Sequence, residues 1–204
     1  MRVGDAMRLA YASDLRETGI PVIGLEATGW LAGFLNSESL SQSMAVVEPP
    51  KSFIGTLRPY QVRGVSWMAF MERLGFGLCL ADDMGLGKTI QLLALMAFER
   101  EHAAGERIGP TLLMVPMSVV GNWIHETRRF CPILRVLLHH GAERLTGEAL
   151  TKAASESDLV ITTYALAHRD KDALAEVGWW RVVLDEAQYI KNPLAKQTQA
   201  VRAL

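Results

Sequence analysis

A glycine-rich turn between two apolar stretches is the feature that most constrains how this chain can fold. The run GLCLA at residues 77–81 predicts a buried strand, the turn DDMGLGKT follows at 82–89, and IQLLALM at 90–96 has an apolar helical pattern. At a strand-to-helix junction, the backbone N–H groups of such a turn can close around phosphates, and the helix N-terminus adds partial positive charge. The sequence therefore predicts a nucleotide phosphate site.

Individual residues of this turn have distinct predicted roles: Gly85 and Gly87 let the backbone approach closely, and Lys88 reaches the β and γ phosphates. The Thr89 hydroxyl is predicted to hold Mg²⁺. The general G-x-x-x-x-G-K-[ST] pattern is matched only in its second half, because Asp82 occupies its first position. The predicted nucleotide contacts of the turn are Asp83, Met84, Gly85, Leu86, Gly87, Lys88, Thr89 and Ile90. The alternative, a loop whose glycines only turn the chain, does not explain a lysine at the start of an apolar helix.

The run RVVL at 181–184, followed by Asp185 and Glu186, supplies the carboxylates that an ATPase with such a loop needs. The apolar run predicts a buried strand with Asp185 at its carboxyl end, where open α/β sheets place their ligands. We assign Asp185 to Mg²⁺ and Glu186 to activation of the attacking water, and with Lys88 these are the predicted catalytic residues. The structural alternative makes Asp185 a helix cap and Glu186 a solvated acid of the first helical turn.

Helix-like segments alternate with short apolar runs beyond residue 56. Besides 77–81, these runs lie at 111–115, 134–138, 159–163 and 181–185. Such alternation predicts an α/β fold with a parallel sheet covered by helices on both faces. Residues 1–47 have a weaker helical pattern, and paired prolines at 49 and 50 predict a linker. We therefore expect a helical segment and linker over 1–50, readable as the tail of an upstream domain, and a nucleotide-binding lobe over 51–204.

Composition narrows the class of protein. The 21 lysine and arginine residues balance 22 acidic residues, so DNA contacts have to be argued from local motifs. No apolar run approaches the roughly 18 residues of a membrane span, and no membrane partner is expected. Cys79 and Cys131 lack metal-ligand spacing, are expected in the core and suit a reducing compartment. We expect a cytoplasmic protein, associated with the nucleoid if it is bacterial.

From about residue 53 onward the chain resembles the Swi/Snf-type ATPases of helicase superfamily two, and bacterial members in particular. LRPYQ at 57–61, followed by Gly64, Val65 and Trp67, resembles the adenine-side motif of that family. The resemblance implies that Gln61 contacts the base with Arg58 beside it. It also implies a RecA-like lobe that uses ATP and Mg²⁺. The turn at 82–91 resembles the family's phosphate loop, in which an acidic residue replaces the first glycine, although residue 83 is Asp where the family usually has Glu.

Two further segments resemble the family's DNA-facing motifs. They are VPMSVVGNW at 115–123 and ITTY at 161–164. The contacts implied are Ser118, Asn122, Thr162 and Thr163. The structural alternatives are a helix cap at Ser118 and ordinary strand positions for the two threonines.

Two other positions are interpreted separately. Gln188 ends the sequence DEAQ, where many relatives carry His, and the resemblance implies that it couples the nucleotide site to an opposing lobe. His139 and His140 are interpreted as structure at a strand end, because neighbouring strand residues point to opposite faces and cannot easily share a metal.

The resemblance implies an ATP-driven translocase on double-stranded DNA that remodels protein–DNA complexes. Its motor has a second RecA-like lobe that supplies arginines, and this sequence stops at Leu204. Because such arginines contribute roughly 10³ to 10⁵ in rate, the isolated chain is expected to hydrolyse ATP very slowly, and an incomplete sheet would leave an unpaired edge. The alternatives are a strand-separating DNA or RNA helicase and a nucleotide-dependent binding module without motor activity.

Overall fold

The structure, a computed structural model, describes residues 45–204. Within them the chain divides into two compact units, one formed by 45–49 and 56–91 and the other by 50–55 and 92–204. Helix α5 (Lys88–His102) begins in the first unit and ends in the second. Most of the helical segment predicted over 1–50 lies outside the described residues. Over 45–204, none of the helices combines the length and the apolar character required to cross a membrane.

The first unit contains helix α4 (Pro59–Arg73), which starts at a proline. Pro at the first helical position has its φ already fixed and lacks only an N–H that would have no partner there. Ser66 in this helix is buried, accepts a hydrogen bond from the Val47 N–H (2.9 Å) and donates to the Val62 carbonyl (2.8 Å). The chain that precedes α4 is thereby fixed to the buried face of the helix.

The strand predicted over residues 77–81 is not formed. This segment is extended but belongs to none of the four strands of the described sheet, and Leu78 is 39% exposed. The described part of the first unit contains no other strand with which it could form a hydrogen-bonded ladder. Cys79 is exposed, so its predicted core position is wrong, whereas Cys131 is buried as predicted.

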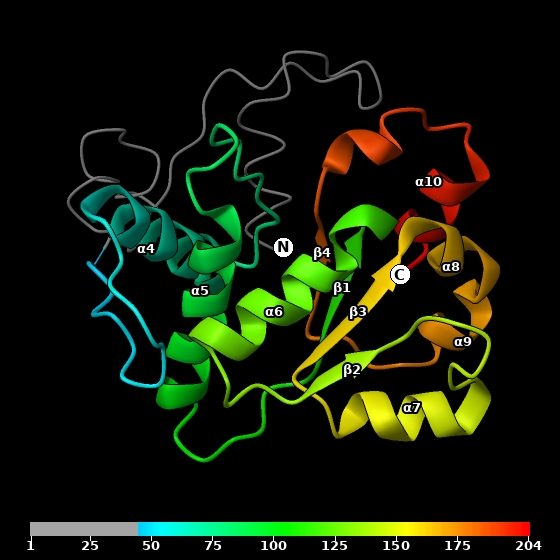
Figure 1. Cartoon of the computed structure of the whole chain (residues 1–204), viewed down its shortest axis with the longest axis horizontal. Helices are drawn as coiled ribbons and strands as arrows, with labels where there is room; N and C mark the ends of the chain where they lie inside the picture. Colours follow the sequence, from blue (N-terminus) through cyan, green and yellow to red (C-terminus); the bar gives the residue numbers. More distant parts are fainter. Residues whose placement is uncertain (1–44) are drawn as a thin grey trace, which may run out of the picture. The chain divides into compact units, whose positions relative to one another are not determined.

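The second unit is built on a parallel sheet with the strand order β2-β3-β1-β4 (Figure 1). The strands are β1 (Thr111–Val115), β2 (Val136–Leu138), β3 (Leu159–Thr163) and β4 (Arg181–Leu184). In the register, β1 residue 111 pairs with residue 159 of β3 and residue 181 of β4. The predicted strands 111–115 and 159–163 are reproduced residue for residue, and the predicted parallel α/β sheet is confirmed.

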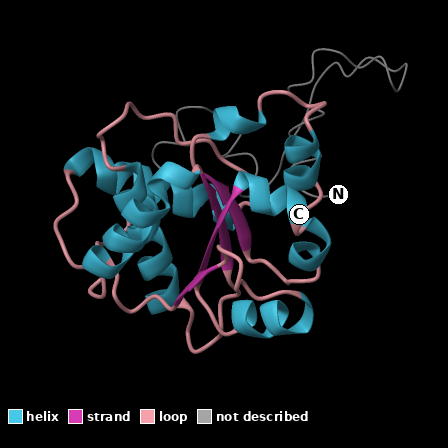
Figure 2. Cartoon of the chain, turned by 45° about the vertical axis from the view of Figure 1, so that its right-hand side comes forward, coloured by secondary structure: helices cyan, strands magenta, loops and turns pink. Residues whose placement is uncertain are grey.

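Helices flank the strands on both sides (Figure 2). They are α6 (Val120–Phe130), α7 (Gly147–Ser155), α8 (Tyr164–Arg169), α9 (Lys171–Ala175) and α10 (Lys196–Arg202), with 3₁₀ turns η1 (Met117–Val119) and η2 (Ala187–Ile190). Leu112, Met114 and Val160 on one sheet face form a core with residues of α7 to α10. Leu113 and Ile161 point to the opposite face, because side chains alternate along a strand, and they are fully buried as well. The central strands β1 and β3 are thus covered on both faces.

Candidate functional site

The phosphate loop of the first unit has the local geometry that its sequence predicts. Gly85 and Gly87 have φ values of +84° and +77°, in the left-handed region that glycine adopts without strain from a Cβ. Helix α5 begins at Lys88 directly after the loop. The Lys88 ammonium donates to the carbonyl oxygens of Asp82 (2.6 Å) and Asp83 (3.1 Å). An ammonium group and a helix N-terminus therefore meet at one loop, which favours an anion such as a nucleotide phosphate.

The first turn of α4 holds this loop in place. The Gln61 side-chain amide donates to the Leu86 carbonyl (3.1 Å), and the Tyr60 hydroxyl reaches the same oxygen (3.2 Å). The other end of the Gln61 amide accepts from the backbone N–H of Arg58 (2.9 Å), and Gln61 is only 5% exposed. A base contact by Gln61 or the exposed Arg58 stays a prediction, and the observed role of Gln61 is to link the helix start to the loop.

Sequence reasoning missed Gln91, which contacts the first residue of the loop. Its side-chain amide donates to the Asp82 carboxylate (3.0 Å), and the residue is fully buried in α5. A Cβ at Gly64 of α4 would collide with the Gln91 side-chain oxygen, so glycine at that position makes room for this contact. A single polar residue in the otherwise apolar stretch 90–98 was the available signal, because a buried amide requires hydrogen-bond partners.

The other predicted nucleotide contacts surround these residues. Asp83 and Met84 are exposed, Met84 to 88%, and Leu86 is 37% exposed. Thr89 and Ile90 are partly buried in the first turn of α5. Backbone groups of an exposed turn are open to a ligand, so the loop is accessible as a phosphate site requires.

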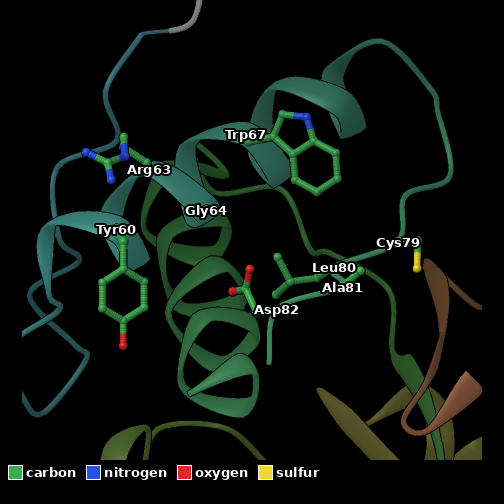
Figure 3. A pocket seen from close by; sticks show the side chains of 8 residues that line it. All are labelled: Tyr60, Arg63, Gly64, Trp67, Cys79, Leu80, Ala81 and Asp82. Carbon is green, nitrogen blue, oxygen red and sulfur yellow. The ribbon is translucent and has the colours of Figure 1, made fainter. Parts of the chain in front are cut away.

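An open hollow of about 530 Å³ lies beside the loop within the first unit. Helix α4 contributes Tyr60, Arg63, Gly64 and Trp67, and the extended segment before the loop contributes Cys79, Leu80, Ala81 and Asp82 (Figure 3). Its walls combine two aromatic rings with one acidic and one basic side chain. Such a mixed lining can accept a planar polar group.

Asp185 of the second unit lies at the carboxyl end of β4, as the sequence predicts. Its N–H donates to the Met114 carbonyl (2.9 Å), which extends the ladder between β1 and β4 by one residue. Its carboxylate oxygen Oδ2 accepts from the Trp123 indole N–H (2.8 Å), and its carbonyl oxygen accepts from the Tyr164 hydroxyl (2.7 Å). The following turn η2 begins after Glu186 and has no side-chain cap, so the alternative of Asp185 as a helix cap is not realised.

Glu186 has an unusual backbone for a residue with a side chain. Its φ of +55° and ψ of +56° place it in the left-handed region. A residue other than glycine held there stores about 1–3 kcal/mol of strain, and such residues are concentrated at functional sites. Its carboxylate accepts a hydrogen bond from the side chain of Gln188, which is exposed. The carboxylate assigned to water activation thus has a defined direction.

Tyr164 is the buried neighbour of these acids. Burial raises the pKa of its hydroxyl above the ordinary value, and the negative charges of Asp185 and Glu186 raise the pKa further. The Tyr164 ring stacks on Tyr189 of η2, with centroids 5.2 Å apart and planes 6° from parallel. The hydroxyl is therefore a proton donor at neutral pH, as its contact with the Asp185 carbonyl requires.

Two of the four predicted DNA contacts are exposed. Ser118 lies in η1 and Asn122 in the first turn of α6, and both side chains face solvent. The N-cap of α6 is Val119, without a side-chain hydrogen bond, so Ser118 does not cap this helix. Both polar side chains are therefore free of a capping role and accessible to a partner.

The side chains of the other two predicted DNA contacts are buried and make hydrogen bonds within the protein. Thr162 is fully buried, and its hydroxyl donates to the carbonyl of His139 (3.2 Å). A side chain without exposed surface cannot reach DNA in this conformation, so the Thr162 hydroxyl is not available as a contact here, and DNA binding by this segment stays a prediction. Thr163 is 6% exposed, and its hydroxyl caps α8 by accepting from the Leu166 N–H (3.4 Å). Strand threonines are often inward-facing, and the sequence alone does not give the face.

Oxygen donors are what Mg²⁺ requires, and each of the two predicted ligands supplies one within its own unit. Mg²⁺ is held in nucleotide sites by one or two protein oxygens, substrate phosphates and water. In the second unit, Asp185 offers a partly buried carboxylate at the carboxyl end of a strand, fixed in direction by an indole N–H. In the first unit, Thr89 offers a hydroxyl in the first turn of α5. Each residue has the donor chemistry that the ion takes.

A family model described as the SNF2-related domain matches residues 60–204. The chain belongs to the SNF2-related family. YwqA of Bacillus subtilis strain 168, named as a candidate ATP-dependent helicase/translocase, is 40% identical over 193 residues, which cover 94% of this SNF2-related chain and 21% of YwqA. The ISWI chromatin-remodeling complex ATPase CHR11 of Arabidopsis thaliana is 34% identical over 84% of the chain and 16% of its own length.

Solved structures show the same fold. The SWI2/SNF2 ATPase core of Sulfolobus solfataricus in complex with double-stranded DNA matches with a TM-score of 0.68 and 43% identity, over 78% of this SNF2-related chain and 32% of that chain. The RecA-like fold predicted from the sequence is thereby confirmed. The chain thus spans 21% of the length of YwqA and 32% of the Sulfolobus solfataricus chain.

Proposed function

We propose that this chain is the ATP-binding lobe of a larger DNA-dependent ATPase that translocates on double-stranded DNA and remodels protein–DNA complexes. The observation that carries this proposal is the pair Asp185 and Glu186 at the carboxyl end of β4, one fixed by the Trp123 indole and the other held in a strained backbone. Family membership and the relatives named as ATPases support it.

Each candidate site residue has a separate proposed role in ATP hydrolysis. Lys88 binds the β and γ phosphates over the loop whose carbonyls it now contacts. Asp185 and Thr89 are the residues that would hold Mg²⁺, and the bound ion would neutralise charge on the phosphates. Glu186 accepts the proton of the attacking water. A second RecA-like lobe is the proposed partner, because the resemblance to Swi/Snf-type ATPases implies one, and an arginine supplied to the transferring phosphate contributes roughly 10³ to 10⁵ in rate.

Double-stranded DNA is the nucleic acid along which we propose that the full-length protein moves. A similar ATPase core has been solved with double-stranded DNA, and the exposed Ser118 and Asn122 lie at the N-terminal end of α6, where phosphates are favoured. We place the protein in the cytoplasm, associated with the nucleoid if it is bacterial. The name of YwqA also includes helicase activity, and a strand-separating motor is the outcome that single-strand stimulation would reveal.

The proposal is tested with the full-length parent protein. ATP hydrolysis is measured without nucleic acid and with double-stranded DNA, single-stranded DNA or RNA. Stimulation by duplex DNA alone supports translocation, stimulation by single strands or RNA indicates an unwinding helicase, and no stimulation indicates a nucleotide-dependent binding module.

The catalytic assignment is tested by Glu186→Gln in the same protein. Loss of a general base lowers the rate by about 10² to 10⁴, and ATP binding should remain. Glu176→Gln is the matched control, because Glu176 is an exposed acid elsewhere in the second unit. Hydrolysis that survives Glu186→Gln would contradict the assignment.

A further inference from the structure

Two aromatic side chains converge on Asp185 from the two segments predicted to face DNA. Trp123 follows Asn122 in α6, and its indole N–H donates to Oδ2 of Asp185 (2.8 Å). Tyr164 follows Thr163 at the end of β3, and its hydroxyl donates to the Asp185 carbonyl (2.7 Å). One residue at the end of β4 thus accepts a hydrogen bond from each of these segments.

The contact of Trp123 is a constrained one. Trp123 is 4% exposed, and its indole N–H is the only polar group of the side chain. A buried donor that loses its partner is unfavourable, so the indole and the carboxylate have to move together. The Asp185 carboxylate is therefore oriented by the position of α6.

The contact of Tyr164 acts on the backbone between the two acids. The Asp185 carbonyl that it binds belongs to the peptide group joining Asp185 to Glu186. Glu186 has a left-handed backbone, so a rotation of that peptide changes the direction of its carboxylate. Tyr164 is 3% exposed and also stacks on Tyr189, which fixes its hydroxyl against this peptide.

We propose that Trp123 and Tyr164 are positioning residues that couple DNA binding to ATP hydrolysis, by transmitting a shift of α6 or of the β3–α8 junction to Asp185 and Glu186. The inference rests on the proposed function, because it assumes that Asp185 holds Mg²⁺ and that these segments bind DNA. In this proposal Trp123 orients the Asp185 carboxylate, which is assigned to Mg²⁺. Tyr164 orients the peptide group between Asp185 and Glu186.

The test uses Trp123→Phe in the full-length protein, which keeps an aromatic ring and removes the donor. The matched control is Trp179→Phe, because the Trp179 indole also donates one hydrogen bond within the second unit, to the Leu174 carbonyl (2.8 Å). Loss of a hydrogen bond to a charged group changes an equilibrium or rate constant by about tenfold or more. Trp123→Phe should therefore lower the duplex-stimulated rate of ATP hydrolysis about tenfold. It should also raise the Mg²⁺ concentration for half-maximal rate several-fold. Trp179→Phe should change neither value.

Tyr164→Phe is a second, independent variant. It should lower the duplex-stimulated rate and leave the Mg²⁺ requirement closer to that of the parent, because the hydroxyl binds the carbonyl and does not touch the carboxylate. Thermal unfolding of every variant separates a folding defect from a coupling defect.

The outcomes separate this inference from the proposed function. If Trp123→Phe and Tyr164→Phe both retain the parent's duplex stimulation and Mg²⁺ requirement while Glu186→Gln is inactive, the coupling role is overturned and the ATPase assignment stands. If the parent protein is not stimulated by duplex DNA, the proposed function fails, and this inference fails with it. If Glu186→Gln remains active, the catalytic assignment on which the inference depends is overturned. A higher Mg²⁺ requirement confined to Trp123→Phe, with Trp179→Phe unchanged, supports the positioning role.

Discussion

The side-chain nitrogen of Gln61 donates to the carbonyl oxygen of Leu86 over 3.1 Å, which ties the first turn of α4 to the phosphate loop. The contact is possible because the next residue, Gly87, has no side chain. A Cβ at Gly87 would lie 2.5 Å from the same Gln61 nitrogen, and the φ of Gly87 is +77°. The loop conformation thus depends on glycine for two separate reasons.

Gly87→Ala is therefore expected to disrupt the phosphate loop. The left-handed backbone alone costs an alanine about 1–2 kcal/mol, and the collision with Gln61 adds to it. Nucleotide affinity, measured by titration with a fluorescent ATP analogue, should fall at least about tenfold for a cost of this size.

Gly121→Ala is the control for this substitution. Gly121 lies in α6, and nothing approaches within 4 Å of a Cβ built there. Alanine at this position should raise the free energy of unfolding by about 0.5 kcal/mol without a loss of nucleotide affinity. Equal nucleotide affinity of Gly87→Ala and the parent would contradict the structural argument.

Lys88→Met removes the ammonium from the phosphate loop. Charged hydrogen bonds contribute about 1.5–3 kcal/mol, so ATP should bind at least about tenfold more weakly to the full-length variant. Isothermal titration calorimetry checks this, with Lys191→Met as the control at an exposed lysine outside the loop. Adenosine, which lacks phosphates, should bind equally to parent and variant. Weaker adenosine binding by Lys88→Met would show a folding defect in place of a lost phosphate contact.

The sequence identified the candidate catalytic residues, but it did not identify the residues that hydrogen-bond to them. Lys88 and Asp185 could be placed because each sits at the end of a local pattern, a glycine turn before a helix and an apolar run ending in an acid. The bond from Trp123 to Asp185 joins residues 62 apart in the chain. It depends on the order of strands in the sheet, and no local pattern encodes that order.

The strands show the same limit. Residues 111–115 and 159–163 are reproduced because central parallel strands are buried on both faces and therefore read as continuous apolar runs. Residues 77–81 have an equally apolar sequence but pair with no strand of the described sheet. The sequence also does not show which side chains of a strand point inward. Thr162 is polar, yet its side chain points inward and donates a hydrogen bond to a backbone carbonyl. Hydrophobicity predicts a tendency to burial and leaves the hydrogen-bond partner undetermined.

The two cysteines should differ sharply in reactivity. Cys79 is exposed, whereas Cys131 is fully buried, and burial raises the pKa of the Cys131 thiol to about 11. Thiolate is the reactive form, so little of Cys131 is reactive at neutral pH. In folded protein treated with N-ethylmaleimide, peptide mass mapping should find Cys79 modified and Cys131 unmodified. Both should react in urea. Modification of Cys131 at the rate of Cys79 in the folded protein would contradict its burial.

The last prediction concerns pH and starts from a buried histidine. His139 at the end of β2 is 1% exposed, and its Nε2 lies 3.0 Å from the Asp170 carboxylate. Its Nδ1 has no hydrogen-bond partner among the described residues, so protonation would bury an N–H without an acceptor. Burial lowers the pKa of His139 below the usual 6.5, although Asp170 opposes the shift. The pKa of Asp170 is itself lowered, chiefly by its hydrogen bond with Arg144.

The sign of the pH effect follows from proton binding in the two states. Below pH 6.5 the unfolded chain protonates His139 while the folded chain resists, so the unfolded state binds more protons and stability falls as the pH falls. One such group can change the free energy of unfolding by at most about 1.4 kcal/mol per pH unit. Urea unfolding followed by tryptophan fluorescence between pH 7 and pH 5 should show this decline. His139→Asn should flatten it, whereas His125→Asn, at an exposed position in α6, should keep it. An unchanged slope in His139→Asn would show that another group causes the decline.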